Sequence, residues 1–148
     1  MKPHVFEIRP FDGVGPIRLG MSRQELRRLL GGEVEAFRKT QDSPTLSDYF
    51  NDYMAVAFYT PNDLLDAFEF SQGNVEWQGI QLMGRIGGEV LREMQQYSKQ
   101  IEIDAGVIFH DLGIALYVPS WGTRPDEDEE NIVESVLVFS RTHYTSDY

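Results

Sequence analysis

Histidines, serines and acidic residues are the side chains of this sequence that could carry catalysis or bind a metal. The three histidines, His4, His110 and His143, are not spaced at i, i+2 or i+4 from one another, so no local metal-binding motif is present. The chain has no cysteine, which excludes disulfides, thiol nucleophiles and thiolate metal sites. The Gly-x-Ser-x-Gly context of a serine nucleophile is also absent. We therefore expect no enzymatic activity and no bound metal or cofactor.

Two local patterns keep a functional alternative open. The stretch that begins Gly13-Val14-Gly15-Pro16 is rich in glycine. A dinucleotide-binding loop needs a third glycine three positions after the second and a strand before the first, so we interpret this stretch as a turn. His110-Asp111 stands at the start of a predicted strand, where the first half of the chain has Asn51-Asp52. The shared aspartate suits turn geometry, and catalysis by the pair is the alternative.

An acidic segment of the second half is the most individual feature of the chain. Trp121 is followed, after a short loop sequence, by five consecutive acids: Asp126, Glu127, Asp128, Glu129 and Glu130. The run lacks the alternating ligands and the central glycine of a Ca²⁺ loop. An aromatic anchor beside a run of carboxylates is suited to binding a basic partner, so these six residues are our candidate partner-binding site. The alternative is a solvated hairpin tip with Trp121 folded back on the sheet.

The formal net charge is −11, from 24 acids and 13 bases, and it is unevenly distributed. Residues 1–74 contribute −3 and residues 75–148 contribute −8. Such a field repels nucleic acid and anionic membranes and attracts cationic proteins or metal ions. We therefore predict a basic protein as partner, with neither nucleic acid nor a membrane. Solubility alone is the alternative explanation of the charge.

Length and composition indicate a packed globular protein. The lack of a signal-peptide core and of a membrane-spanning stretch leads us to expect that it stays in the cytoplasm. With 148 residues, 41% of them hydrophobic and 12% aromatic, the chain can bury a core without cross-links. Glu7, Arg9 and Pro10 interrupt the segment where a signal peptide needs an apolar core. No stretch reaches the roughly 18 apolar residues that a membrane helix needs.

The clearest local signal is a capping box at Ser22-Arg23-Gln24-Glu25, which predicts a helix over residues 23–30. Leu26, Leu29 and Leu30 give that helix an apolar stripe, and the following Gly31-Gly32 ends it. An extended lead-in over residues 17–19 precedes it. Residues 53–59 and 64–70, separated by a turn sequence, predict a hairpin after it.

The second half repeats this order of elements. The lead-in, helix and hairpin of the first half have counterparts in the same order in the second half. These are a lead-in at residues 80–82, a helix at 89–97 and strands at 114–119 and 136–140. We therefore predict two diverged repeats, about 13–71 and 76–140, within a single domain 1–148. The expected fold is α+β, with one mostly antiparallel sheet and both helices packed on one face. Residues 72–79 would be a linker between the repeats.

The sequence GPIRLGMSRQEL, residues 15–26, resembles a widespread bacterial pattern: Ile-x-Leu-Gly-Met-Ser/Thr leading into a helix. The pattern is similar to the start of SmpA/OmlA lipoprotein modules and of the tandem-repeat β-lactamase inhibitor proteins, and to many small immunity partners of bacterial toxins. The match covers about 20 residues. This chain departs from the first two groups because it has no signal peptide, lipidated cysteine or disulfide. The resemblance implies a protein that binds and inhibits another protein.

The leading expectation is a cytosolic immunity-type inhibitor that occludes a cationic toxin or enzyme. The acidic run would speed association and Trp121 would hold the complex. One alternative is a small-ligand-binding domain, possibly with an enzymatic activity that uses Asp111 and His110. Another is a structural or assembly subunit.

Overall fold

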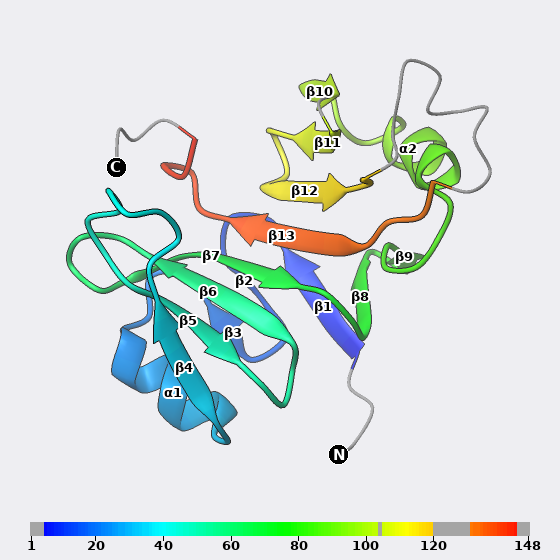
Figure 1. Cartoon of the computed structure of the whole chain (residues 1–148). Coiled ribbons are helices and arrows are strands. Elements are labelled where there is room, and N and C mark those ends of the chain that lie inside the picture. The colour runs from blue at the N-terminus through cyan, green and yellow to red at the C-terminus, as the bar shows by residue number, and fades with distance from the viewer. Residues whose placement is uncertain (1–4, 104, 120–130, 145–148) are drawn as a thin grey trace.

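Two short helices and two β-sheets make up the fold over the residues that the structure, a computed structural model, describes: 5–103, 105–119 and 131–144 (Figure 1). The helices are α1 (Arg23–Leu30) and α2 (Gly87–Met94). Most of the regular structure is strand, and the predicted α+β class is confirmed. In these ranges no helix is long and apolar enough to cross a membrane.

The larger sheet is antiparallel throughout and has the strand order β10-β11-β12-β13-β7-β6-β5-β4. Each half of the chain supplies four successive strands, and the two groups meet where Val136 of β13 lies opposite Phe70 of β7. The strands from the first half are β4 (Val34–Phe37), β5 (Ser47–Phe50), β6 (Ala55–Tyr59) and β7 (Leu65–Phe70). Those from the second half are β10 (Ile101–Ile103), β11 (Gly106–Phe109), β12 (Ile114–Tyr117) and β13 (Ser135–Phe139).

The smaller sheet has five strands in the order β3-β2-β1-β8-β9. They are β1 (Val5–Arg9), β2 (Gly13–Val14), β3 (Ile17–Arg18), β8 (Asn74–Trp77) and β9 (Ile80–Gln81). β1 and β8 run parallel, and the other neighbours are antiparallel. The expectation that residues 72–79 are only a linker was wrong, because β8 lies inside this range and buries Val75 and Trp77. A single sheet was also expected, and the structure has two.

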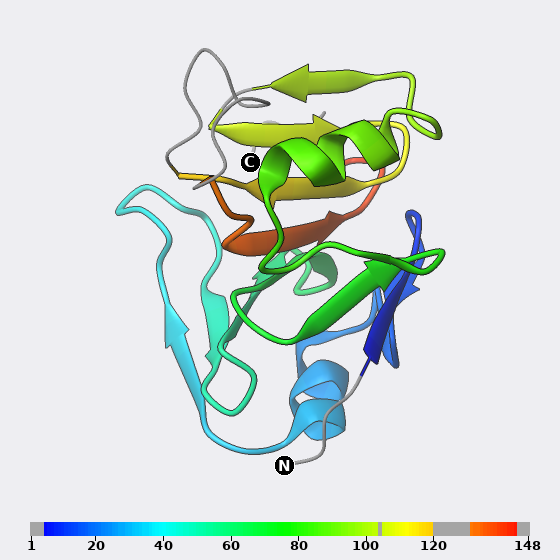
Figure 2. The same cartoon turned by 90° about the vertical axis from the view of Figure 1, so that its right-hand side faces the viewer.

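Alternation along the strands gives the larger sheet one buried face. A row of inward-facing residues crosses six of its strands, and all its members are buried: Asp48, Ala57, Phe68, Val138, Ile114 and Phe109. Leu26 of α1, Met94 of α2 and Phe6 of the smaller sheet belong to the same core, and the rings of Phe6 and Phe70 lie 4.9 Å apart. Figure 2 shows α2 in front of the strands from the second half. The helices and the smaller sheet therefore share one core with this face of the larger sheet.

The first helix has the predicted boundaries, and the second is displaced. Ser22 Oγ accepts the backbone N–H of Glu25, Glu25 Oε1 accepts that of Ser22, and Gly31 caps the other end. The predicted hairpin is also present, because β6 and β7 pair antiparallel. α2 begins at Gly87 and ends at Met94, whereas residues 89–97 were expected. Its N-cap, Ile86, has no side chain that can accept a hydrogen bond, so no sequence signal marks the start.

Candidate protein-binding face

The face of the larger sheet that points away from the core, here called the open face, carries a row of side chains that crosses all eight strands. Each member of the row is half-buried or exposed, and successive members are cross-strand partners. From β4 to β10 the row consists of Glu35, Tyr49, Val56, Glu69, Leu137, Ala115, Ile108 and Glu102. Period-two alternation places these residues on the opposite side from the buried row.

The row is apolar between its acidic positions. Glu35 and Glu102 stand on the two edge strands, and Glu69 stands on the central strand β7. Among its eight members there is no lysine or arginine. The row can therefore bury apolar surface of a partner while its carboxylates face cations.

Two hollows adjoin the part of the row that is formed by strands from the second half of the chain. One has a volume of about 580 Å³ and the other about 180 Å³. Glu69, Tyr117 and Ser135 line both, so they stand between the two hollows. The smaller hollow is otherwise mainly apolar and includes Ile108 and Leu137 of the row. This part of the open face is thus hollowed rather than flat.

A turn near the C-terminal end of the chain packs on another part of the open face. Asp66 is buried and stands in β7 at the register shift between β6 and β7. Ser140 Oγ donates to Asp66 Oδ1 at 2.5 Å, and His143 Nδ1 lies 2.7 Å from Asp66 Oδ2. The carboxylate stands between the hydroxyl and the imidazole, whereas a nucleophilic triad needs the imidazole between the other two. The contacts therefore fix the turn on the sheet.

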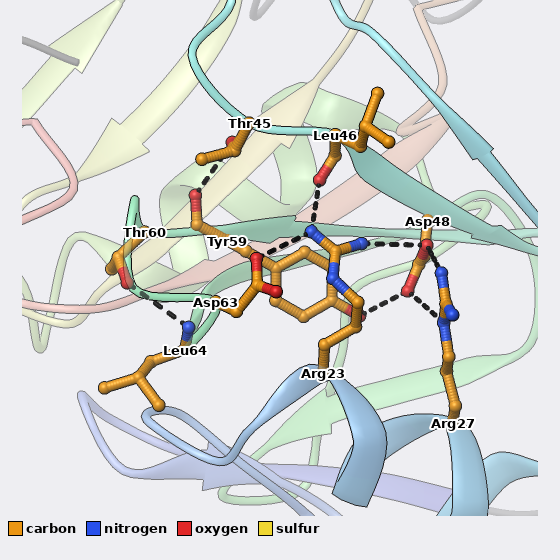
Figure 3. A network of polar contacts seen from close by, with 9 residues as sticks. All are labelled: Arg23, Arg27, Thr45, Leu46, Asp48, Tyr59, Thr60, Asp63 and Leu64. Atoms are coloured by element: carbon orange, nitrogen blue, oxygen red, sulfur yellow. Dashed lines mark hydrogen bonds and ion pairs between the residues drawn. The ribbon is translucent and has the colours of Figure 1, made fainter.

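The most elaborate polar cluster lies on the core side and joins α1 to the sheet (Figure 3). Asp48 is fully buried, and each of its carboxylate oxygens accepts two hydrogen bonds. Arg23 Nη1 donates to Oδ1 at 3.0 Å, and Arg27 donates to both oxygens, at 2.6 and 2.9 Å. The Tyr59 hydroxyl donates to Oδ2 at 2.8 Å, and the Arg23 guanidinium stacks 4.0 Å from the centre of the Tyr59 ring.

These contacts set the ionisation of the cluster. Burial alone would raise the pKa of Asp48, but the hydrogen bonds from Arg27 and Tyr59 and the charge of Arg23 outweigh it and hold the pKa below its usual value. Burial, together with the neighbouring carboxylate, raises the pKa of Tyr59 well above its usual value. Because every acceptor position of Asp48 is occupied, the cluster positions α1 and has no free base to offer a substrate.

The sequence-predicted site residues lie in different parts of the chain. Trp121, Asp126, Glu127, Asp128, Glu129 and Glu130 lie outside the described residues. His110 Nε2 lies 2.8 Å from Glu102 Oε1, at one end of the open-face row.

Asp111 has different partners from its neighbour His110. It accepts the backbone N–H of Lys99 at 2.7 Å and the hydroxyl of Ser98 at 2.5 Å. Its side chain thus holds the loop after α2, as a turn aspartate does. Across the described ranges no group of three His, Asp or Glu side chains is arranged to bind a metal ion.

Comparison with known proteins gave no match to any family model, curated protein or solved structure. Sequence reasoning did not identify the open-face row, although the signal was present: every second residue of each predicted strand faces away from the core.

Proposed function

We propose that this protein is a protein-binding module that uses the open face of its eight-stranded sheet to occlude a basic protein, most concretely a toxin or enzyme that it inhibits. The observation that carries the proposal is the row from Glu35 to Glu102, which is apolar in its interior and acidic at both ends and at its centre. Inhibition would be steric, because a rigid sheet that covers a partner's active surface needs no chemistry of its own.

The open-face row is long enough to span a standard protein–protein interface. Eight strands have seven spacings of about 4.8 Å, so the row is roughly 34 Å long. A standard interface buries about 800 Å² on each partner, which corresponds to a patch somewhat under 30 Å across. The backbone of the row is held by a paired sheet, so little backbone entropy is lost when the row is covered.

Charge selects the class of partner. The net charge of −11 attracts a cationic protein over distances up to about a Debye length, roughly 8 Å at physiological salt. The run from Asp126 to Glu130 belongs to the connection between β12 and β13, two strands that contribute to the open face. In this proposal the run raises the association rate, and Trp121 slows dissociation.

The strand order supports a second part of the proposal, that the open face arose by duplication of one unit. Each half has a helix followed by four antiparallel strands, and the order is symmetric about the β13–β7 pair. In both halves an aspartate at the same turn lies against the loop after the helix. Asp111 binds the loop after α2, and a Cβ on Gly32, after α1, would overlap Asp52. Each unit then supplies four members of the row.

Binding of a small ligand is the runner-up, because the larger hollow has a suitable size. Its volume of about 580 Å³ falls within the range of about 300–1,000 Å³ that is common for ligand sites. A ligand-binding domain would gain thermal stability from a small molecule and would not retain a protein during purification.

The proposal is tested by changing the open face and comparing it with a matched surface. Tagged wild type is purified from its native cells, and the retained proteins are identified by mass spectrometry. We expect a basic protein that is retained by wild type and lost with Leu137→Arg, since a cation in the row opposes a cationic partner. Leu29→Arg on α1, at a position 43% exposed, is the control and should retain it. Equal retention by both variants would exclude the open face as the binding surface.

The role of the acidic run has its own test with the purified partner. Changing Asp126, Glu127, Asp128, Glu129 and Glu130 to Asn and Gln should slow association and weaken its dependence on salt. Trp121→Ala should act mainly by raising the dissociation rate. Wild-type association kinetics of the neutralised variant at every salt concentration would show that the run is ordinary solvated surface.

A further inference from the structure

We propose that the larger hollow beside the open face receives an arginine or lysine side chain of the partner, an inference that rests on the proposed function. We call it the cation pocket and define it by Glu69, Tyr117 and Glu134, which line it. The expected ligand is a positively charged group at the end of an aliphatic chain.

The lining of the cation pocket matches both parts of such a side chain. Glu69 and Glu134 supply two carboxylates, and none of the described residues that line the pocket is basic. Met83 and Val133 supply apolar wall for the stem. A long cationic side chain buries its methylenes against apolar surface while its head stays with polar groups, which is the arrangement found here.

The Glu69 carboxylate and the backbone of Glu134 are held in place before any ligand arrives. Ser135, which is 7% exposed, donates its hydroxyl to Glu69 Oε2 at 3.1 Å. Glu69 itself stands on β7, which is paired on both sides. The backbone N–H of Glu134 donates to the carbonyl of Tyr117 at 2.9 Å, so the segment before β13 is tied to β12. Because the Glu69 carboxylate is already ordered, pairing it with a cation costs little further entropy.

Tyr117 adds an aromatic surface that favours a cation over a neutral group. Its side chain is 47% exposed and stands between the cation pocket and the smaller apolar hollow. Arginine stacks on aromatic rings elsewhere in this fold, as Arg23 does on Tyr59 and Arg141 on Phe11. A cation near an aromatic face is attracted by the negative charge density of the ring. A neutral side chain in the pocket would leave two carboxylates partly desolvated without compensation.

The test uses small probes and the full-length protein, so it does not require the partner. Nα-acetyl-arginine amide and Nα-acetyl-lysine amide are titrated into ¹⁵N-labelled protein, with Nα-acetyl-citrulline amide as the neutral isostere of the first. We expect saturable amide shifts at Ser71, Gly84 and Ser135 with millimolar affinity, as is usual for so small a ligand. Citrulline should give none. The arginine and lysine arms show which cation the pocket prefers, and binding of either supports the proposal.

Matched variants locate the charge that matters. Glu69→Gln should weaken the cationic probe roughly tenfold, because it removes a charge-assisted partner. Asp42→Asn removes an exposed charge from the loop between β4 and β5, outside both the row and the pocket, and should leave the affinity for the probe unchanged. Glu134→Gln changes an exposed side chain and keeps the test valid if Glu69→Gln lowers stability. Citrulline binding as tightly as arginine, an equal loss with Asp42→Asn and Glu69→Gln, or no binding of either cation would overturn the proposal.

Failure of the pocket and failure of the proposed function give different results. If neither cationic probe binds but Leu137→Arg still loses the partner, the open face stands as the binding surface without a cation pocket. If a probe binds and Leu137→Arg retains the partner, the pocket is a cation site and the open face is not the binding surface.

Discussion

Replacing Asp48 by asparagine should test how much of the stability depends on the charge buried between α1 and the sheet. The change keeps the size of the side chain but removes the negative charge, so Arg23 and Arg27 lose their shared counter-charge. One oxygen of the carboxylate also becomes an amide N–H₂ group, which faces donors instead of accepting from them.

The loss of stability in Asp48→Asn depends on how exposed the side chains of Arg23 and Arg27 are. Removing one partner from a buried ion pair costs about 3–5 kcal/mol. The Arg27 side chain is 40% exposed and can be hydrated again, and Arg23 keeps its contact with Asp63 at 3.0 Å. We therefore expect the lower end, about 3 kcal/mol, which for a protein of this size lowers Tm by roughly 6–12 °C.

The control is Asp63→Asn, which removes a carboxylate that also contacts Arg23 but is 59% exposed. Exposed ion pairs contribute about 0–1 kcal/mol, so this variant should be nearly as stable as wild type. Urea unfolding followed by far-UV circular dichroism and by tryptophan fluorescence, to which the buried Trp77 contributes, measures the free energies of unfolding of both variants. Equal free energies of unfolding for the two variants would refute the argument that burial makes the Asp48 charge important.

The stability that Asp48 contributes should depend on pH in a definite direction. Because the folded state holds the pKa of Asp48 below its ordinary value of 3.8, the charge stabilises the fold above that value. This contribution is lost as the pH falls through the lowered pKa of the folded state. The difference in stability between wild type and Asp48→Asn should therefore be constant near neutral pH and shrink only below pH 3.8.

Two further predictions concern the helix cap and the division of the chain. Ser22→Ala removes the acceptor for the Glu25 backbone N–H, so it should lower the free energy of unfolding by about 1 kcal/mol and Tm by a few degrees. Partner binding should not change. A fully stable but inactive variant would instead indicate a functional serine. A fragment of residues 1–74 exposes the edge of β7 that normally pairs with β13, so it should be unfolded or aggregated by circular dichroism and size-exclusion chromatography, and cooperative melting would contradict this.

Local signals in the sequence predicted the elements whose boundaries depend on neighbouring residues. The box of Ser22 and Glu25 fixed the start of α1, and Gly31 fixed its end. The central pair of the smaller sheet had no such signal, because it is parallel and joins residues 5–7 to residues 74–76. Pairing between distant segments depends on tertiary packing, which a single sequence does not display.

The candidate site could be predicted only in part for similar reasons. The composition predicts an acidic protein without a catalytic motif, and strand alternation is sufficient to find residues such as Val56 and Glu69 on one face. The buried charge of Asp48 could not be read from its strand, where an aspartate favours a solvent-facing position. The i, i+4 spacing of Arg23 and Arg27 on α1 was the available hint, since it places two cations on one side of the helix.

The position of β13 has a consequence for how the chain folds. It is the last strand of the described sequence, yet it lies near the middle of the larger sheet, between β12 and β7. During synthesis the two halves of the sheet therefore stay unjoined until residues 135–139 have left the ribosome. Pairings of such high contact order close slowly, so newly made chains expose strand edges for longer than a helical protein of equal length would. The pairing of β13 with β7, which makes the open face continuous, should thus be among the last to form.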